Sequence, residues 1–185
     1  VNHSQTFSPT SRLDGNLTFA SGQAYYENNS NNLNTLLRQN IVSNFTYSKS
    51  WEGTPFIFSA NYYRDQNLIT GSINENIPSL NFSITQSYPF QSETSTIDNK
   101  SLFEYFAYSY QGSYLNNRVK TVIQGVKGND SLEFRNNRMG AVHKVSFNLS
   151  PHSQFVSIIP YLNYNEFWYS KTVVRRYSPF AKIIL

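Results

Sequence analysis

The clearest pattern in the chain is the alternation of apolar and polar residues over 77–90, IPSLNFSITQSYPF. A period of two is typical of a β-strand with one apolar and one polar face. Such a strand fits the core of a soluble β-sandwich, or a transmembrane barrel wall with lipid outside and water inside. The apolar set, which Gln86 alone interrupts, is Leu80, Phe82, Ile84, Tyr88 and Phe90, and the polar set is Ser79, Asn81, Ser83, Thr85 and Ser87.

The same alternation occurs twice just before this strand. Residues 41–51 place Phe45, Tyr47 and Trp51 on one face and polar residues such as Asn44 and Thr46 on the other. After a tight connection at residues 52–55, the next strand alternates Phe56, Phe58, Ala60 and Tyr62 with more polar positions. Two alternating runs joined by a short turn predict a β-hairpin.

Weaker alternation predicts further strands over 16–27, 102–116, 141–149 and 156–174, and 119–126 suggests another. We expect a bulge or an edge at Pro78, because proline cannot donate to a strand ladder. Residues 1–14 are polar and predict a loop or linker, and residues 131–134 suggest a short capped helix. About seven strands result, many with 9–12 alternating residues. These exceed the usual globular length of 5–6 residues and match the 9–11 residues of a strand that crosses a bilayer.

The composition supports a surface of neutral polar side chains. Charged residues make up 14 % of the chain and aromatic residues 16 %, while Asn (23) and Ser (25) form about a quarter of its 185 residues. Aromatic residues recur at strand spacing, which argues against a disordered chain. The net charge is +4, and the basic residues are scattered along the chain, so nucleic acid is not an expected partner. No apolar run reaches the roughly 20 residues of a membrane helix, and no cysteine is present.

No catalytic, cofactor or metal site is predicted. His3, His143 and His152 are far apart in sequence, and no metalloprotease, nucleophile-elbow or phosphate-loop motif occurs. We therefore expect a protein that is not an enzyme.

The aromatic residues near strand ends suggest a membrane boundary, although a sandwich core closed by aromatic residues would look similar. Candidates for lipid-facing or interface positions are Tyr47, Trp51, Phe56, Phe58, Phe82, Ile84, Tyr88 and Phe90. Candidates for a water-filled lumen are Asn44, Thr46, Asn81, Ser83 and Thr85.

Four segments, in the same order, resemble the barrel region of LptD-type lipopolysaccharide-assembly proteins, in a divergent branch. WEGTPFIFS from Trp51 resembles a "PGTPF" hairpin, with Glu52 in place of proline. IPSLNFSIT from Ile77 and the following YPF resemble "LPxLxFxxxxxYPF". FRNNRMGAVH from Phe134 is similar to "FxxxxNGxxH", with Met139 in place of asparagine, and LNYNEFWY from Leu162 resembles "xxYNExWY". The similarity covers about residues 16–177.

The resemblance implies an all-β fold, an antiparallel up-and-down meander that forms part of a transmembrane barrel wall, over residues 15–185. It implies location in the bacterial outer membrane and insertion of lipopolysaccharide into the outer leaflet. The implied partners are lipopolysaccharide, outer-membrane lipid, an LptE-like lipoprotein plug and the periplasmic bridge proteins of the pathway. We expect the chain to be a section of a longer barrel, so no lateral-gate residue is assigned. A porin or receptor barrel and a soluble carbohydrate-binding β-sandwich remain alternatives.

Overall fold

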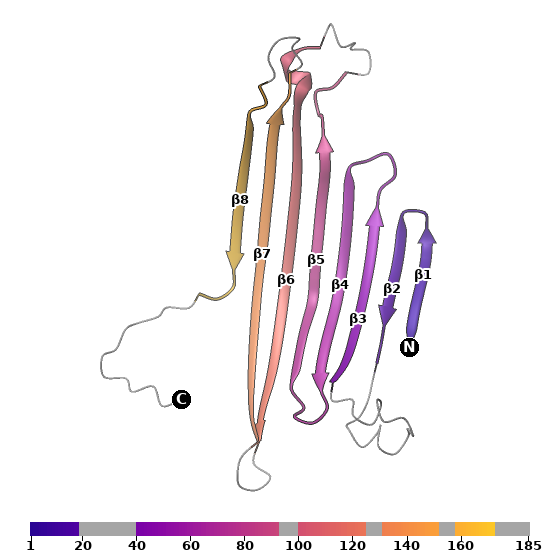
Figure 1. Cartoon of the computed structure of the whole chain (residues 1–185), viewed down its shortest axis with the longest axis vertical. Coiled ribbons are helices and arrows are strands. Elements are labelled where there is room, and N and C mark those ends of the chain that lie inside the picture. The colour runs from indigo at the N-terminus through magenta and orange to yellow at the C-terminus, as the bar shows by residue number, and fades with distance from the viewer. Residues whose placement is uncertain (19–39, 93–99, 125–130, 152–157, 173–185) are drawn as a thin grey trace, which may run out of the picture.

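The computed structural model describes residues 1–18, 40–92, 100–124, 131–151 and 158–172. Within these ranges, eight antiparallel strands form one sheet in which each strand pairs with the next in sequence (Figure 1). This confirms the predicted all-β, up-and-down meander. The strands are β1 (Asn2–Ser8), β2 (Ser11–Asn16), β3 (Asn40–Ser50), β4 (Phe56–Asn67), β5 (Ile73–Ser87), β6 (Phe106–Gln124), β7 (Ser131–Leu149) and β8 (Tyr161–Tyr169).

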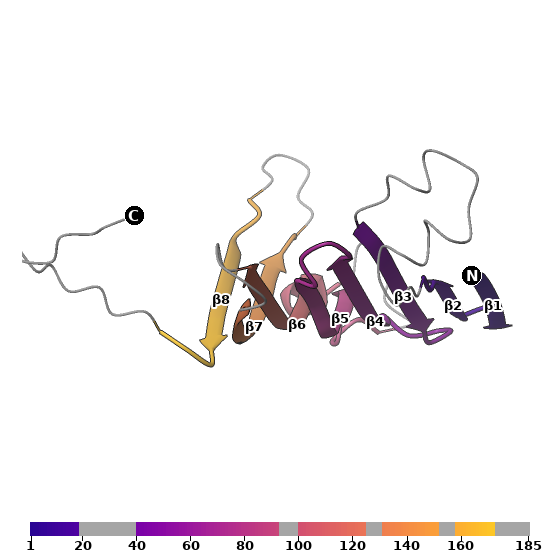
Figure 2. The ribbon, with the colours of Figure 1, turned by 90° about the horizontal axis from the view of Figure 1, so that it is seen from below.

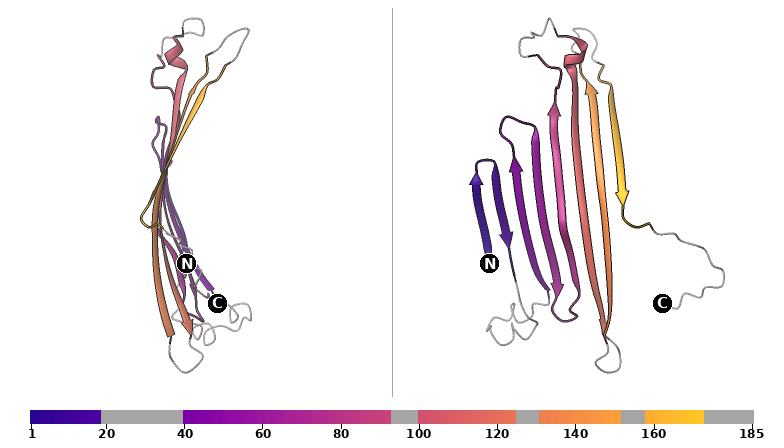
Figure 3. Two further views of the ribbon diagram at one scale, coloured as in Figure 1. Left: turned by 90° about the vertical axis from the view of Figure 1, so that its left-hand side faces the viewer. Right: turned by 180° about the vertical axis from the view of Figure 1, so that it is seen from behind.

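The sheet is a single, twisted and open layer, with β1 and β8 at its two edges (Figures 2 and 3). A β-sandwich needs a second sheet to cover its apolar face, and the described strands provide only one. In the described part of the chain, Ile41, Leu68 and Ala107 are the only buried apolar residues. The large apolar side chains therefore need a covering from outside the described sheet, as in the wall of a barrel.

The first 14 residues differ from the sequence prediction. They form not a loop or linker but most of the β1–β2 hairpin, whose second strand pairs with β3. Leu13 lies opposite Gln5 on one side and Tyr47 on the other. Backbone pairing with β3 holds these residues in a strand, although their side chains are mostly polar. Most of the strand predicted over 16–27 lies outside the described residues.

The bulge predicted at Pro78 is confirmed. The pairing of β5 with β6 shifts between Asn76 and Ser79, and the Ile77–Pro78 peptide bond is cis. Asn116 Nδ2 donates a hydrogen bond of 2.7 Å to the Ile77 carbonyl oxygen, which replaces a ladder bond at this irregular point. β5 lies inside the sheet, so the alternative of an edge strand is wrong.

Strands β6 and β7 are the longest, with 19 residues each. β6 joins the two strands predicted over 102–116 and 119–126, after a short 3₁₀ turn, η2 (Leu102–Tyr105). The helix predicted at 131–134 is wrong, because these residues pair with 121–124 and begin β7. No helix in the described part of the chain is long and apolar enough to span a membrane.

Candidate functional site

One side of the sheet, which we call the polar face, carries the small neutral side chains. Paired residues lie on the same face, and Thr46 lies opposite Asn61 in the β3–β4 ladder. The Asn61 amide donates hydrogen bonds to Asn44 Oδ1 (2.7 Å) and Thr46 Oγ1 (2.8 Å). Ile57 interrupts this face beside Ser83. A polar surface of amide and hydroxyl side chains therefore crosses several strands.

The polar face contains the predicted lumen candidates of β3 and β5. Asn81 lies opposite Ser59 on β4 and Ser113 on β6. Thr85 lies one residue past the last β4–β5 pair, and its backbone N–H donates to the Pro55 carbonyl (2.9 Å). The register thus brings Asn44, Thr46, Asn81 and Ser83 to one side of the sheet.

The opposite side, which we call the apolar face, carries a row of rings that crosses β4 to β8. Ring centroids are 6.1 Å apart for Phe56 and Phe82, and 6.1 Å for Phe82 and Tyr110. His143 follows at 6.1 Å from Tyr110, and Trp168 at 4.8 Å from His143. One continuous aromatic surface therefore connects five neighbouring strands.

Five predicted lipid-facing residues lie on this apolar face, while three lie beyond strand ends. Pairing places Tyr47, Phe56, Phe58, Phe82 and Ile84 together. Trp51 follows the end of β3, and Tyr88 and Phe90 follow the end of β5.

The alternation predicted to continue through Phe90 is broken after Ile84. The β5–β6 register shifts there, and Ser87 lies opposite Tyr108, on the apolar side. Phe90 nevertheless contacts the rim of the aromatic surface, because its ring is 5.8 Å from that of Phe106. The sequence pattern could not locate this irregularity, because a polar residue at Gln86 fits either a bulge or a regular strand.

A small polar cluster lies within the apolar face. Tyr110 Oη and His143 Nδ1 are 2.7 Å apart, within hydrogen-bond distance. The Tyr110 ring covers Gly112, where a Cβ atom would overlap the tyrosine hydroxyl. Glu166 lies opposite His143 in the register and accepts a 2.7 Å hydrogen bond from Trp168 Nε1. Most polar atoms of the cluster are thus paired with each other.

This cluster offers no evident catalytic arrangement. His143 Nε2 is buried without a hydrogen-bond partner in the described part of the chain. The described residues contain no group of three His, Asp, Glu or Cys side chains that could hold a metal ion. The geometry is that of a structural contact between β6, β7 and β8.

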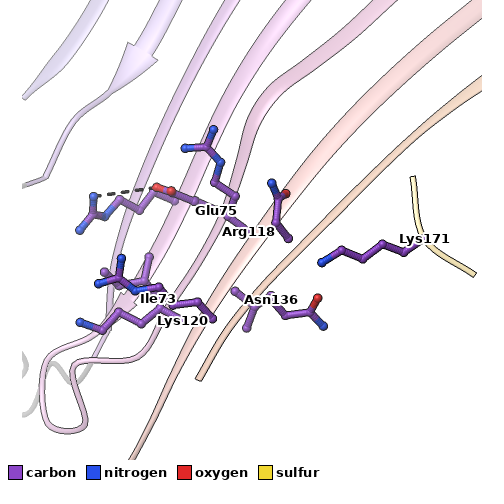
Figure 4. Close-up of a pocket in the computed structure, with 10 residues that line it drawn as sticks. Ile73, Glu75, Arg118, Lys120, Asn136 and Lys171 are labelled. Atoms are coloured by element: carbon purple, nitrogen blue, oxygen red, sulfur yellow. Dashed lines mark ion pairs between the residues drawn. The ribbon is translucent and has the colours of Figure 1, made fainter. Parts of the chain in front are cut away.

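A second feature, which we call the basic groove, lies near the ends of β6 and β7 that follow each other in sequence (Figure 4). Its volume is about 510 Å³. The groove is lined by residues from β4 to β7 and by Lys171, which follows β8. Its charged lining residues are Arg64, Glu75, Arg118, Lys120, Arg135 and Lys171.

Ion pairs satisfy part of the charge in the groove. Arg64 Nη1 is 4.0 Å from Glu75 Oε2, and Lys120 Nζ is 2.9 Å from Glu133 Oε2. Glu133 also pairs with Arg135. Hydrogen bonds from Lys120 and Arg135 hold the pKa of the Glu133 carboxyl below its usual value, so that it stays ionised. Two carboxylates, Glu75 in the lining and Glu133 beside it, therefore balance only part of the charge of the five lining cations, which leaves a surplus of positive charge.

The sequence analysis did not identify the basic groove. Six of its ten lining residues come from the stretch whose alternation was weakest, between residues 117 and 138. A signal was present, because Arg118 and Lys120, like Glu133 and Arg135, are two residues apart and so share one face of a strand. Only the pairing of β6 with β7 brings both sets together.

Comparison with known proteins identifies the family. The family model described as "LptD protein" matches residues 1–184. No curated protein and no solved structure matches the chain.

Proposed function

The chain belongs to the LptD protein family, which takes part in lipopolysaccharide transport and outer-membrane assembly, and on this premise we propose that it forms a section of a barrel wall in the bacterial outer membrane. This wall encloses a wet passage through which lipopolysaccharide reaches the outer leaflet. The role is transport and not catalysis. Lipopolysaccharide, outer-membrane lipid, an LptE-like plug and the periplasmic bridge proteins are its proposed partners.

One observation supports this role above others, namely the separation of the two faces of a single sheet. The aromatic row from Phe56 to Trp168 suits contact with lipid tails, and the Ser, Asn and Thr side chains suit a hydrated lumen. The strands range from 6 to 19 residues in length. β3, β4 and β8 have 11, 12 and 9 residues, close to the 9–11 residues of a strand that crosses a bilayer.

We assign the apolar face to lipid and the polar face to the lumen. The lipid-facing residues are Tyr47, Phe56, Phe58, Phe82 and Ile84, with Trp51, Tyr88 and Phe90 at the rim. The lumen-facing residues are Asn44, Thr46, Asn81, Ser83 and Thr85. An amphiphile can pass such a lumen because neutral amides and hydroxyls bind its sugars without holding it as tightly as charged groups do.

Photo-crosslinking in cells tests the proposed passage. A photoreactive phenylalanine replaces Ser113, on the polar face, in the full-length protein. We expect a lipopolysaccharide adduct that disappears when the supply of lipopolysaccharide from the periplasm is stopped.

The same probe at Phe82, on the apolar face, is the matched control. Phe82 faces lipid that is already in the membrane, so its adducts should persist when the supply of new lipopolysaccharide is stopped. Supply-dependent adducts from Phe82 together with none from Ser113 would reverse the assignment of the faces.

A further inference from the structure

The basic groove continues the apolar face in the direction of the strands. Arg64 comes two residues after Tyr62 on β4, and Arg118 four residues after Tyr114 on β6, on the same side of the sheet. At about 3.3 Å per residue, these cations lie roughly 7 and 13 Å beyond the aromatic side chains. The surface therefore changes from apolar to cationic along one face, which complements an amphiphile with an anionic head group.

The groove holds cations that its carboxylates do not neutralise. Arg118 and Lys171 have no ion pair or hydrogen bond among the described residues, whereas Arg64, Lys120 and Arg135 are paired with Glu75 or Glu133. Arg118, from β6, and Lys171, from the segment after β8, both line the groove (Figure 4). Because guanidinium groups match the geometry of phosphate oxygens, such a pair suits a ligand with more than one phosphate.

The lengths of the strands place the groove near the edge of the bilayer-spanning part of the sheet. β6 and β7 have 19 residues each, so about half of each strand extends beyond the 9–11 that cross a bilayer. Outer-membrane barrels have short turns on the periplasmic side and longer excursions outside. Here the connections β1–β2 and β3–β4 (2 and 5 residues) but also β5–β6 (18 residues) lie at one end, while the groove end carries both the longest connection, β2–β3 (23 residues), and the short β4–β5 turn (5 residues) (Figure 1). The outer position of the groove is therefore part of the proposal that follows.

We propose that the basic groove binds the phosphate groups of lipopolysaccharide in the outer leaflet, while the acyl chains of the same molecule lie along the apolar face. This inference rests on the proposed function, because it takes the apolar face to contact lipid and the groove to lie on the outer side. The site differs from the lumen, since it lies on the other side of the sheet. It would hold lipid against the barrel wall after delivery.

A local crosslinking assay tests the groove without interference from the lumen. A photoreactive phenylalanine replaces Ile73, which lines the groove, in purified full-length protein in detergent. The protein is mixed with lipid A that carries two phosphates, and adduct yield is measured against lipid A concentration. We expect the double variant Arg118→Gln/Lys171→Gln to need about tenfold more lipid A for the same yield, since charged hydrogen bonds to phosphate are lost.

Two matched variants control for charge and for folding. Arg138 lies on the polar face of β7, so Arg138→Gln removes a positive charge from the same strand end and should leave the yield unchanged. The swap Arg118→Lys/Lys171→Arg keeps both charges and should restore most of the binding. An equal loss in Arg138→Gln, or no loss in the double variant, would overturn the proposal.

Other ligands separate lipopolysaccharide from simpler sources of phosphate. Lipid A without phosphates and phosphatidylglycerol should each give a much lower adduct yield, and excess inorganic phosphate should not displace lipid A. Equal yields with phosphatidylglycerol, or displacement by inorganic phosphate, would refute the assignment to lipopolysaccharide. If the supply-dependent crosslink at Ser113 is seen while these tests fail, the groove proposal alone is wrong.

Discussion

At the scale of single residues, neighbours along a strand have opposite environments. Ile84 pairs with Phe56 and Tyr110 on the apolar face, while Ser83, one position earlier, pairs with Ile57 and Gln111 on the polar face. Because the period is two, a change of one position moves a side chain from the apolar to the polar face. Substitutions at these two positions therefore test the face assignment directly.

Ile84→Lys should impair assembly of the full-length barrel far more than Ser83→Lys. A lysine on the lipid face costs about 2–4 kcal/mol near the bilayer midplane and less toward the rim, where Ile84 lies opposite the first residue of β4, whereas a lumen lysine stays hydrated. The measurement is the fraction of heat-modifiable, folded protein in outer-membrane preparations. Equal losses in the two variants would show that the faces are not distinguished as we assign them.

The Tyr110–His143 contact is a second residue-scale test. Tyr110→Phe removes the hydroxyl and leaves His143 Nδ1 without its partner within the apolar face. We expect a loss of about 1–3 kcal/mol in the free energy of unfolding, measured by denaturant titration of the full-length protein in detergent. Tyr108→Phe, two residues away on the same face of β6, should change it little, and a similar loss there would argue against the contact.

At the scale of elements, the sequence predicted most strands but not their limits. The alternation around Phe82 located the central strands, because one polar and one apolar set are unmistakable there. The β1–β2 hairpin was missed, since Gln5 and Asp14 give no apolar face and only pairing with β3 defines these strands. The extension of β7 over 131–140 was missed, and that of β6 was predicted as a separate strand over 119–126, because these segments are held by each other and not by an apolar pattern.

The bulge in β5 gives a prediction at this scale. Asn116 is only 5 % exposed, and its amide donates to the Ile77 carbonyl where the ladder is interrupted. Asn116→Ala leaves this carbonyl unpaired and should lower the free energy of unfolding by about 1–3 kcal/mol. Asn165→Ala, at an exposed position of β8, is the control, and an equal effect there would mean that the bulge does not depend on Asn116.

The candidate site could be predicted from the sequence only in part. The sequence predicted that Asn44, Thr46, Asn81 and Ser83 share one face, because each belongs to a regular alternation, and the register confirms this for the four, whereas Thr85 lies past the last β4–β5 pair. That this face lines a lumen stays a prediction. The basic groove was not predicted, because Arg64, Glu75 and Arg118 are far apart in sequence and meet only through the register of three strands.

At the scale of the whole molecule, the described sheet has one large exposed aromatic surface and two open edges. β1 and β8 each pair on one side only, and unpaired strand edges are not tolerated within lipid. A wall of this kind therefore needs neighbouring strands on both sides and lipid on its apolar face. These requirements agree with a section of a closed barrel.

Labelling of single cysteines tests the central claim most directly, because the chain contains no cysteine of its own. Asn81→Cys, Phe82→Cys, Ser83→Cys and Ile84→Cys are introduced singly into full-length protein in outer membranes, in a background without accessible thiols. A water-soluble maleimide should label positions 81 and 83 and leave 82 and 84 unlabelled. Labelling of all four positions at similar rates, or of 82 and 84 alone, would contradict a wall with lipid on the apolar face and water on the polar face.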